Sequence, residues 1–453
     1  MRWTVFRRFA ISCVLLLAAL PVAARTRPHY GGALRVETEG DAWQRPNGIA
    51  RRLVFDGLTR IDAAGSVQSA LATGWESDSG DHRWDFHLRP GVHFQDGSPL
   101  TSTGVVASLN LSCSSNCPWA AVHAVGSAVV FTGDSPMPNL PALLAADDFL
   151  ISLIAPADGS TPQAIIGTGA FQVASSANGV LSLKANEASW QGRPFADTIE
   201  IRSHRPIRDQ WLDLSLGHAD VVEVPAEMIR PAQQQKMGLV ISPPAQLMAL
   251  QVASVGPLAN AQLRAAIAAS IDRSPLANVI FQKQGEAVAS VLPQFLSGDS
   301  FLFPVDRDLN KANALRGGLT TPTLTLAADA DSVMQLAAQR IALNLHEAGF
   351  NATVVMNAAA QHPDLTLRRI PLQGGSPSAV LDQVLRACGE MQIGMPSNPT
   401  ALYKAERTFL DEHTLIPLVD LPRAYAVGPR ARDLHLNDDG TPDLADASLG
   451  DAP

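Results

Sequence analysis

Residues that commonly carry catalysis form no recognised catalytic pattern in this chain. His346 and Glu347 are adjacent, but the second histidine of a zinc-protease helix is missing. A Gly-x-Ser-x-Gly elbow, which would expose a nucleophilic serine, does not occur. The eleven histidines, including His87 and His93, follow no metal-ligand spacing. The sequence therefore disfavours a secreted hydrolase, and we predict a protein that is not an enzyme and uses no cofactor or metal.

Two cysteines four positions apart are candidates for a disulfide. Cys113 and Cys117 enclose Ser-Ser-Asn and precede Pro118, which is typical of a loop where two sulfur atoms can meet. Their spacing differs from a Cys-x-x-Cys redox motif and from common zinc patterns. The alternative is that both are unpaired thiols, and the sequence leaves the two interpretations open.

The length and composition indicate a globular chain with more than one lobe. The 453 residues exceed what one hydrophobic core usually supports, since domains cluster at roughly 100–150 residues. Hydrophobic residues make up 46% and charged residues 17%, without a disordered block or an internal repeat. The formal net charge of −9 lacks the basic excess of a nucleic-acid-binding surface. We therefore expect two or three lobes and no nucleic-acid partner.

Residues 1–24 are predicted to be a cleavable export signal. Three arginines precede an apolar run from Phe9 to Leu20, and small residues follow at 22–24. A membrane anchor is the alternative, but this run spans only ~18 Å as a helix, whereas a hydrocarbon core is ~30 Å thick. Cys13 lies inside the run, so a lipid anchor at the cleavage point is not expected. We predict a periplasmic protein whose charge becomes −12 once these arginines are removed.

Apolar periodicity predicts the strands and helices that would position binding residues. Strand-like segments cover 30–37 and 53–61. A strand over 323–327, a helix with apolar residues every four positions over 333–345, and a strand over 351–356 then follow one another. This order predicts a mixed α/β lobe with helices packed on a sheet. Other helical stripes carry Leu263, Ile267 and Ile271, residues 380–385, and Leu402, Ala405 and Phe409.

An aromatic-rich segment gives a sharper local prediction. Trp84, Phe86 and Leu88 alternate on one face before a Pro-Gly turn, which predicts a hairpin over 84–94. Residues 101–103 then supply hydroxyl groups that can cap the start of a helix.

The order of several segments resembles extracellular solute-binding proteins of family 5, which include dipeptide, oligopeptide, nickel and heme carriers. Residues 53–75, LVFDGLTRIDAAGSVQSALATGW, are similar to the family's Asp-Gly-Leu turn and Leu-Ala-x-x-Trp. Residues 84–100, WDFHLRPGVHFQDGSPL, contain the most specific string, Leu-Arg-x-Gly-Val-x-Phe-x-Asp-Gly. Later segments keep the family's order: GTGAF at 167–171, a Trp-containing segment at 186–194, LRAAIAASIDR at 263–273 and Ile-Pro-Leu at 416–418.

This resemblance implies the periplasmic binding protein type II fold, with two large α/β lobes around a ligand cleft and a smaller inserted lobe. The expected bounds are 25–53, 165–245 and 415–453 for lobe one, 54–164 for lobe two, the insertion, and 246–414 for lobe three. The implied function is the substrate-binding component of an ABC importer, a monomer that closes around a peptide or peptide-like solute and delivers it to permease subunits. The alternative is a binding protein without a transport role, such as a periplasmic sensor or a scavenging or chaperone module.

The resemblance also indicates candidate ligand contacts. The family's loop after the first strand faces the ligand, and here it contains Glu39, Asp41 and Trp43. Asp420 follows the Ile-Pro-Leu segment near the expected hinge. A surface or core role is the alternative for each of these four residues.

One segment of lobe three departs from the family's peptide carriers. In those carriers an acidic residue pairs with the peptide's α-amino group, and the matching position here is Gln373. A neutral amide cannot supply the charge that makes a desolvated amine tolerable. Arg368 and Arg369, in the same segment, suit a carboxylate or phosphate of the ligand; the alternative is a solvated strand end or a salt bridge to a nearby acid. We therefore predict that the usual peptide grip is replaced or lost.

Overall fold

The computed structural model describes most of the chain, namely residues 29–43, 48–62, 65–113, 117–153, 165–298, 303–319, 323–356, 362–372, 376–389, 395–396, 398–437 and 439–450. The predicted export signal at 1–24 lies outside these ranges. Within them, no helix combines the length and the apolar character that crossing a membrane requires.

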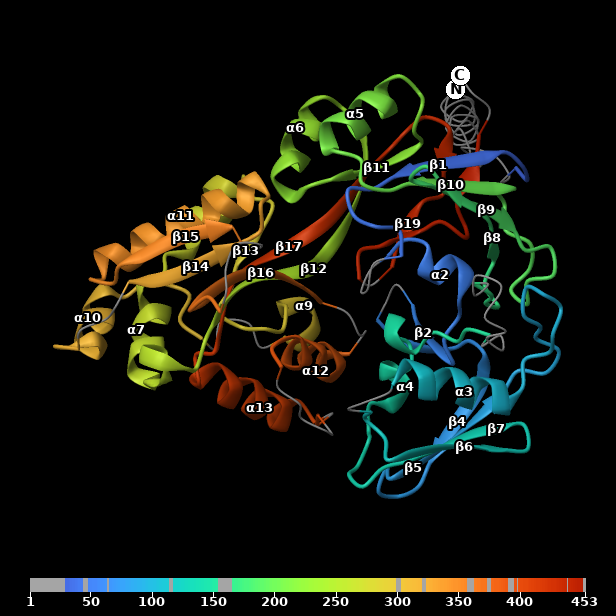
Figure 1. The fold of residues 1–453 in the computed structure, drawn as a ribbon, viewed down its shortest axis with the longest axis horizontal. Helices are drawn as coiled ribbons and strands as arrows, with labels where there is room; N and C mark the ends of the chain where they lie inside the picture. The colour runs from blue at the N-terminus through green and yellow to red at the C-terminus, as the bar shows by residue number, and fades with distance from the viewer. Residues whose placement is uncertain are drawn as a thin grey trace, which may run out of the picture.

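An eleven-stranded sheet runs through the molecule (Figure 1). Ten of its strands are hydrogen-bonded in the order β15 (Ala352–Met356), β14 (Leu324–Ala328), β16 (Leu365–Pro371), β12 (Gly238–Val252), β17 (Leu415–Val427), β11 (Val221–Val224), β1 (Ala33–Glu37), β10 (Thr198–Arg202), β9 (Val180–Ala185) and β8 (Phe171–Ala177). The short strand β13 (Glu286–Ala287) pairs with β17. The two longest strands, β12 and β17, are antiparallel and cross between the two halves of the molecule, so they connect lobe one with lobe three.

The lobe-three half of the sheet is built on a strand–helix–strand unit. The strands β14 and β15 pair in parallel and are joined by α11 (Ser332–Glu347), which confirms the predicted order. Gly349 ends this helix with φ 78°, a left-handed conformation that glycine adopts at little cost. The other helices of this half are α7 (Ala261–Ser270), α8 (Arg273–Pro275), α9 (Gln294–Ser297), α10 (Leu309–Arg316), α12 (Pro377–Ala387) and α13 (Pro399–Asp411).

The lobe-one half is centred on β1. Its neighbours β10 and β11 both pair with it in parallel, and Leu34 and Val36 are fully buried. Helices α5 (Ile207–Ser215) and α6 (Ile229–Gln234) pack on β11 and β17 through Leu214, Ile229 and Ala424. The end of β1 is therefore held between sheet and helices.

The inserted lobe has a separate sheet and core. Its four antiparallel strands lie in the order β4 (Ala72–Ser77), β5 (Arg83–Leu88), β7 (Ala128–Thr132) and β6 (Ala121–Val125). Trp84 and Phe86 are buried in this core, as their alternation predicted. Thr101 caps α3 (Ser102–Ser112) because its Oγ1 accepts a hydrogen bond from the Gly104 amide at 3.1 Å, which confirms the predicted helix start. The smaller elements nearby are α2 (Arg51–Val54), β2 (Thr59–Ile61), β3 (Val67–Ser69) and α4 (Leu140–Leu143).

Two local predictions are wrong. Residues 84–94 do not form a hairpin, because β5 pairs with β4 and β7 while His93 makes an isolated bridge to Pro99. A period of two identifies the buried face of a strand, but the strand's partner depends on tertiary contacts. Residues 51–54, where a strand was expected to begin at 53, instead form the short helix α2.

The cysteine pair is bonded in the structure. Cys113 and Cys117 form a disulfide at the end of α3, with their Cα atoms 5.5 Å apart. Of the two interpretations that the sequence left open, the disulfide is the one found.

Asp56, in the Asp-Gly-Leu turn, organises the junction between lobes one and two. Its buried carboxylate accepts hydrogen bonds from Thr168 Oγ1, Trp190 Nε1 and Gln191 Nε2 at 2.7, 2.9 and 3.0 Å. A buried carboxylate is tolerated where donors surround it. The turn therefore joins the segments that hold the two lobes together.

Two glycines complete this junction. A Cβ at Gly167 would lie 1.9 Å from the carbonyl oxygen of Val54, and one at Gly169 would lie 2.5 Å from that of Leu53. Gln95 bridges the same two segments, since its Nε2 donates to the Val54 carbonyl at 3.1 Å and its Oε1 accepts from the Gly167 amide at 3.0 Å. The Gly-Thr-Gly motif is thus required for close backbone contact.

Candidate functional site

A cavity of about 820 Å³ lies where the three lobes meet. This volume falls within the roughly 300–1,000 Å³ of small-molecule sites. Lobe one contributes the loop after β1 and parts of β11 and β17, lobe two contributes residues 142–149, and lobe three contributes the end of β16 and one side of α12. A solute in this cavity would contact all three lobes at once.

The cavity is lined by charged side chains of both signs. Five arginines face it, together with five carboxylates, and Phe149 is the sole aromatic residue among the described residues that line it. Balanced charge with little aromatic surface suits a small, polar, aliphatic solute more than a flat aromatic one.

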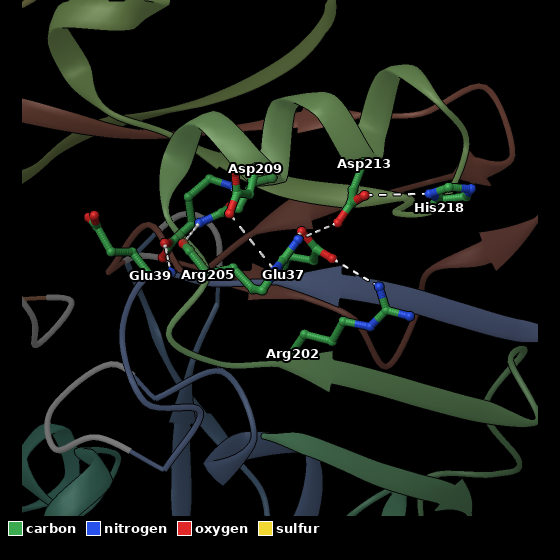
Figure 2. Close-up of polar contacts among 9 residues, drawn as sticks. Glu37, Glu39, Arg202, Arg205, Asp209, Asp213 and His218 are labelled. Atoms are coloured by element: carbon green, nitrogen blue, oxygen red, sulfur yellow. Dashed lines mark hydrogen bonds and ion pairs between the residues drawn. The ribbon is translucent and has the colours of Figure 1, made fainter. Parts of the chain in front are cut away.

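Carboxylates gather where β1 ends. Glu223 of β11 accepts hydrogen bonds from Thr38 Oγ1 at 3.0 Å and from the Glu39 amide at 2.6 Å. Figure 2 shows the Glu39 side chain extending away from the ion-pair cluster behind it. Partial burial, followed by the charges of Glu223, Asp331 and Glu227, raises the pKa of Glu39 against the opposing effect of Arg369. A cationic ligand group would relieve this repulsion.

An ion-pair cluster around the buried Glu37 holds the end of β1 (Figure 2). Glu37 is 1% exposed and lies 3.2 Å from Arg202 Nη1 and 3.6 Å from Arg205 Nε. Arg205 also pairs with Asp213 of α5 at 2.6 Å, and Asp213 lies 3.4 Å from His218. Burial raises the pKa of Glu37, and the neighbouring Asp213 raises it further. The cluster orients the loop that carries Glu39 into the cavity.

Four of the five cavity arginines have polar partners within the protein. Each of these interactions occupies donors that a ligand would otherwise use. The pairs are Arg52 with Asp147 and Asp439, Arg368 with Gln251 and the Ala387 carbonyl, Arg369 with Asp331, and Arg386 with Asp382. The sequence alternative of a salt bridge is thus the one found for Arg369, at 2.9 Å.

The fifth arginine, Arg423, lies on the crossing strand β17. Its Nη1 is buried and has no hydrogen-bond partner among the described residues. Its guanidinium carbon lies 6.0 Å from the ring centroid of Tyr425, and its backbone amide donates to Ser242 Oγ at 3.0 Å. The side chain is therefore held in place by packing while one donor stays unused.

The structure brings four of the seven predicted ligand contacts to the cavity, namely Glu39, Asp41, Arg368 and Arg369. Gln373 lies outside the described residues. Trp43 and Asp420 are not among the lining residues. Ligand contact by any of these residues stays a prediction.

Packing explains where Trp43 and Asp420 lie. The Trp43 ring turns to the lobe-one core, with its centroid 6.3 Å from that of Phe55. Asp420 is 3% exposed and lies where β17 pairs with β13, opposite Glu286. Burial, with added repulsion from Glu286 and Glu406, raises the pKa of Asp420 well above its usual range.

Sequence reasoning did not find Arg423 or Glu223. The Ile-Pro-Leu segment and Asp420 already marked this strand in the sequence, and Arg423 lies only three positions beyond Asp420. However, the pairing of β12 with β17 shifts register at three places, between Ile241 and Pro244, Pro244 and Gln246, and Met248 and Ala249. Such bulges change which side of a strand faces a given partner, and a regular alternation therefore could not identify the residue that faces the cavity.

Lobes two and three touch beside the cavity. Asn139 Nδ2 donates to the Met395 carbonyl at 2.8 Å, and Asn139 Oδ1 accepts from Ser378 Oγ at 2.9 Å. Ala142 and Ala379 belong to one small apolar cluster beside this bridge. The two lobes thus form a direct contact next to the cavity.

A metal centre finds no support in the described part of the chain, where no three His, Cys, Asp or Glu side chains are grouped so that they could hold an ion.

Solved structures share this architecture over nearly the whole chain. The binding protein AgaA of A. tumefaciens R10, in complex with agropinic acid, superposes with a TM-score of 0.79 at 19% identity, covering 93% of this chain and 99% of AgaA. DppA from Helicobacter pylori, in complex with the peptide STSA, gives 0.78 at 16% identity, covering 93% and 98%. The fold is therefore the periplasmic binding protein type II fold, as expected from the sequence.

Sequence comparison gives the family. The uncharacterized protein YhjP of Bacillus subtilis (strain 168) is 32% identical over 166 residues, which are 34% of this chain and 28% of YhjP. This chain thus matches less than a third of that relative's length. The model of the family described as bacterial extracellular solute-binding proteins, family 5 Middle, matches residues 66–369. Since this match covers more than half of the chain, the protein belongs to the bacterial extracellular solute-binding proteins of family 5.

Proposed function

We propose that this protein captures a small polar solute, a peptide or a peptide-like molecule, in the cavity between its lobes and delivers it to the permease subunits of an ABC importer. The observation that carries the proposal is the cavity of about 820 Å³ lined by residues of all three lobes. The bound peptide of DppA and the agropinic acid of AgaA support a solute of this size and polarity.

Capture would proceed by closure of the lobes and needs no chemical step. Glu39, Asp41, Arg368 and Arg369 are the proposed ligand contacts, because they line the cavity from the loop after β1 and from β16. A ligand favours the closed form only through contacts that the open form lacks. The crossing strands β12 and β17 offer the hinge, since few backbone connections must change when the lobes rotate. The protein would act in the periplasm after removal of residues 1–24, as a monomer and not as an enzyme.

Peptide binding would differ from the usual mode. Gln373 stands where peptide carriers place the acid that pairs with the α-amino group, and a neutral side chain leaves that ammonium uncompensated. Glu39, beside Glu223, offers negative charge on the lobe-one side of the cavity instead.

A thermal-shift screen that begins with free dipeptides tests capture, because a ligand that binds only the folded state raises the melting temperature. A solute present at a hundred times its Kd should stabilise the protein by about 2.7 kcal/mol. Cells lacking the gene should then lose uptake of the solute that was identified. Capture without any loss of uptake would contradict the transport role and favour a sensor, and the absence of any binding solute would contradict capture itself.

A further inference from the structure

Arg423 is a cavity arginine that has a buried donor without a hydrogen-bond partner and no ion pair among the described residues. Its Nη1 is buried without a hydrogen-bond partner among the described residues, although the side chain lines the cavity. A buried donor without an acceptor is costly, and more so when it carries charge. An acceptor brought by the solute would remove this cost in the bound state.

The arginines that sequence reasoning favoured for an anionic group are placed differently. Arg368 Nη1 donates to Gln251 Oε1 at 2.7 Å and to the Ala387 carbonyl at 3.0 Å. Arg369 forms an ion pair with Asp331 at 2.9 Å. Arg369 Nε is also buried without a hydrogen-bond partner, but Arg369 has its ion pair with Asp331, whereas no ion pair of the Arg423 guanidinium occurs in the described part of the chain.

The surroundings of Arg423 keep it charged. Burial works against the charged form, but the nearby Tyr425, Glu223, Asp439 and Asp147 outweigh burial and raise the pKa of Arg423. The guanidinium is therefore fully protonated at any pH of biological interest.

The acidic neighbours supply charge without supplying a direct hydrogen bond. Glu223 accepts from Thr38 and from the amide that follows it. Asp147 and Asp439 both lie against Arg52, at 2.9 and 3.5 Å. These carboxylates thus stabilise the charge of Arg423 from a distance and leave Nη1 available.

We propose that Arg423 binds a carboxylate of the captured solute on the lobe-one side of the cavity. This inference rests on the proposed function, because it names the chemistry of the solute that the same cavity would hold. A guanidinium presents its donors in a planar fork that matches the two oxygens of a carboxylate. Arg423 lies on the crossing strand β17, which connects the lobes. The proposed contact between its guanidinium and the carboxylate of the solute would therefore form at this connection.

Calorimetric titration with matched pairs tests the inference. The pairs are Ala-Ala and Ala-Ala amide, N-acetylalanine and its amide, and succinate and succinamide. We expect a carboxylate to bind at least about tenfold more tightly than its amide twin, which corresponds to about 1.4 kcal/mol. Arg423→Gln should weaken carboxylate binding by about tenfold or more, and Arg423→Lys, which keeps the charge but loses the fork, should weaken it less.

Arg432→Gln is the matched control, because Arg432 is an exposed arginine of lobe one outside the cavity. It should leave every affinity within about twofold. The inference is overturned if acid and amide twins bind alike, if Arg423→Gln retains carboxylate affinity within about twofold, or if no carboxylate of the panel binds at millimolar concentration. If neutral members of the panel bind the wild type and Arg423→Gln equally well, solute capture stands but the proposed carboxylate contact does not. A protein that binds no solute at all would contradict the proposed function as well.

Discussion

At the scale of single residues, the charged groups of this protein divide into those that satisfy one another and those that do not. Arg52 has a carboxylate partner, Asp147, at 2.9 Å, and Arg35 has one, Asp220, at 3.0 Å. By contrast, Arg423 Nη1 and Asp420 Oδ1 are buried and lack hydrogen-bond partners among the described residues. Asp420 does not line the cavity, so its effect should appear in stability and not in binding.

Asp420→Asn should stabilise the protein, and increasingly so as the pH rises. The pKa of Asp420 is raised in the folded state by burial and by Glu286 and Glu406, so the fold binds this proton more tightly than the unfolded chain does. The stability that the protonated Asp420 carboxyl group contributes is fully present below its pKa in the unfolded chain, about 3.9. This contribution is lost as the pH rises through the higher pKa of the same group in the folded protein. A gain of about 1 kcal/mol would raise Tm by about 1 °C in thermal unfolding, because the unfolding entropy grows with chain length.

Melting curves of both proteins from pH 4 to pH 8 check this effect. Asp306→Asn is the control, because Asp306 is exposed and the same charge is removed. A difference between wild type and Asp420→Asn that stays constant with pH, or that favours the wild type at high pH, would contradict the prediction.

At the scale of elements, the recognisable motifs maintain the lobe junction more than they contact a solute. The Asp56 turn and the Gly-Thr-Gly segment lie against each other, outside the cavity lining. Gly167 is the tightest point, with space for no side chain beside the Val54 carbonyl.

Gly167→Ala should therefore destabilise the protein by about 1–3 kcal/mol, because its Cβ would overlap a backbone atom that cannot move aside freely. Urea unfolding would measure the change. Gly74→Ala is a matched control, since a Cβ at Gly74 meets nothing within 4 Å. Equal stability of the two variants would contradict the prediction, because it would mean that the backbone at the junction moves to make room for the Cβ.

Asn139→Ala should loosen the contact between lobes two and three. Both ends of the Asn139 amide are bonded to lobe three, so the substitution removes two hydrogen bonds worth about 1–2 kcal/mol together. We expect a lower Tm and a larger radius of gyration in small-angle scattering of the ligand-free protein. Asn110→Ala, an exposed change in the same lobe, should alter neither quantity, and an unchanged radius and Tm for Asn139→Ala would disprove the bridging role.

Local signals in the sequence were sufficient for many elements but not for their partners. The β14–α11–β15 unit and the Thr101 cap were predicted because periodicity and capping act within a few residues. The hairpin over 84–94 was wrong because β5 finds its partners, β4 and β7, through tertiary packing. Glu39 and Arg369 reached the cavity as expected, whereas Arg423 was missed because the bulges of β12 and β17 are not visible in a pattern.

At the scale of the whole molecule, the eleven-stranded sheet and the cavity between the lobes define the architecture. The crossing strands β12 and β17 join lobes one and three, and the inserted lobe reaches across to lobe three through Asn139. The solute would therefore sit between bodies that can rotate, with its charged groups meeting Glu39 on one element and Arg423 on another. Capture by closure follows from this arrangement if the cavity is the binding site.

Native mass spectrometry of protein purified from its own periplasm tests that claim most directly, when the wild type is compared with a variant whose cavity is filled. Ala146 is half-buried and lines the cavity, so Ala146→Trp should block it, whereas Ala124→Trp adds the same ring to an exposed strand of the same lobe. If the solute binds in the cavity, a small molecule should remain bound to the wild type and to Ala124→Trp, and it should be lost from folded Ala146→Trp. Retention of the same molecule by Ala146→Trp, or its absence from the wild type, would contradict solute capture in this cavity.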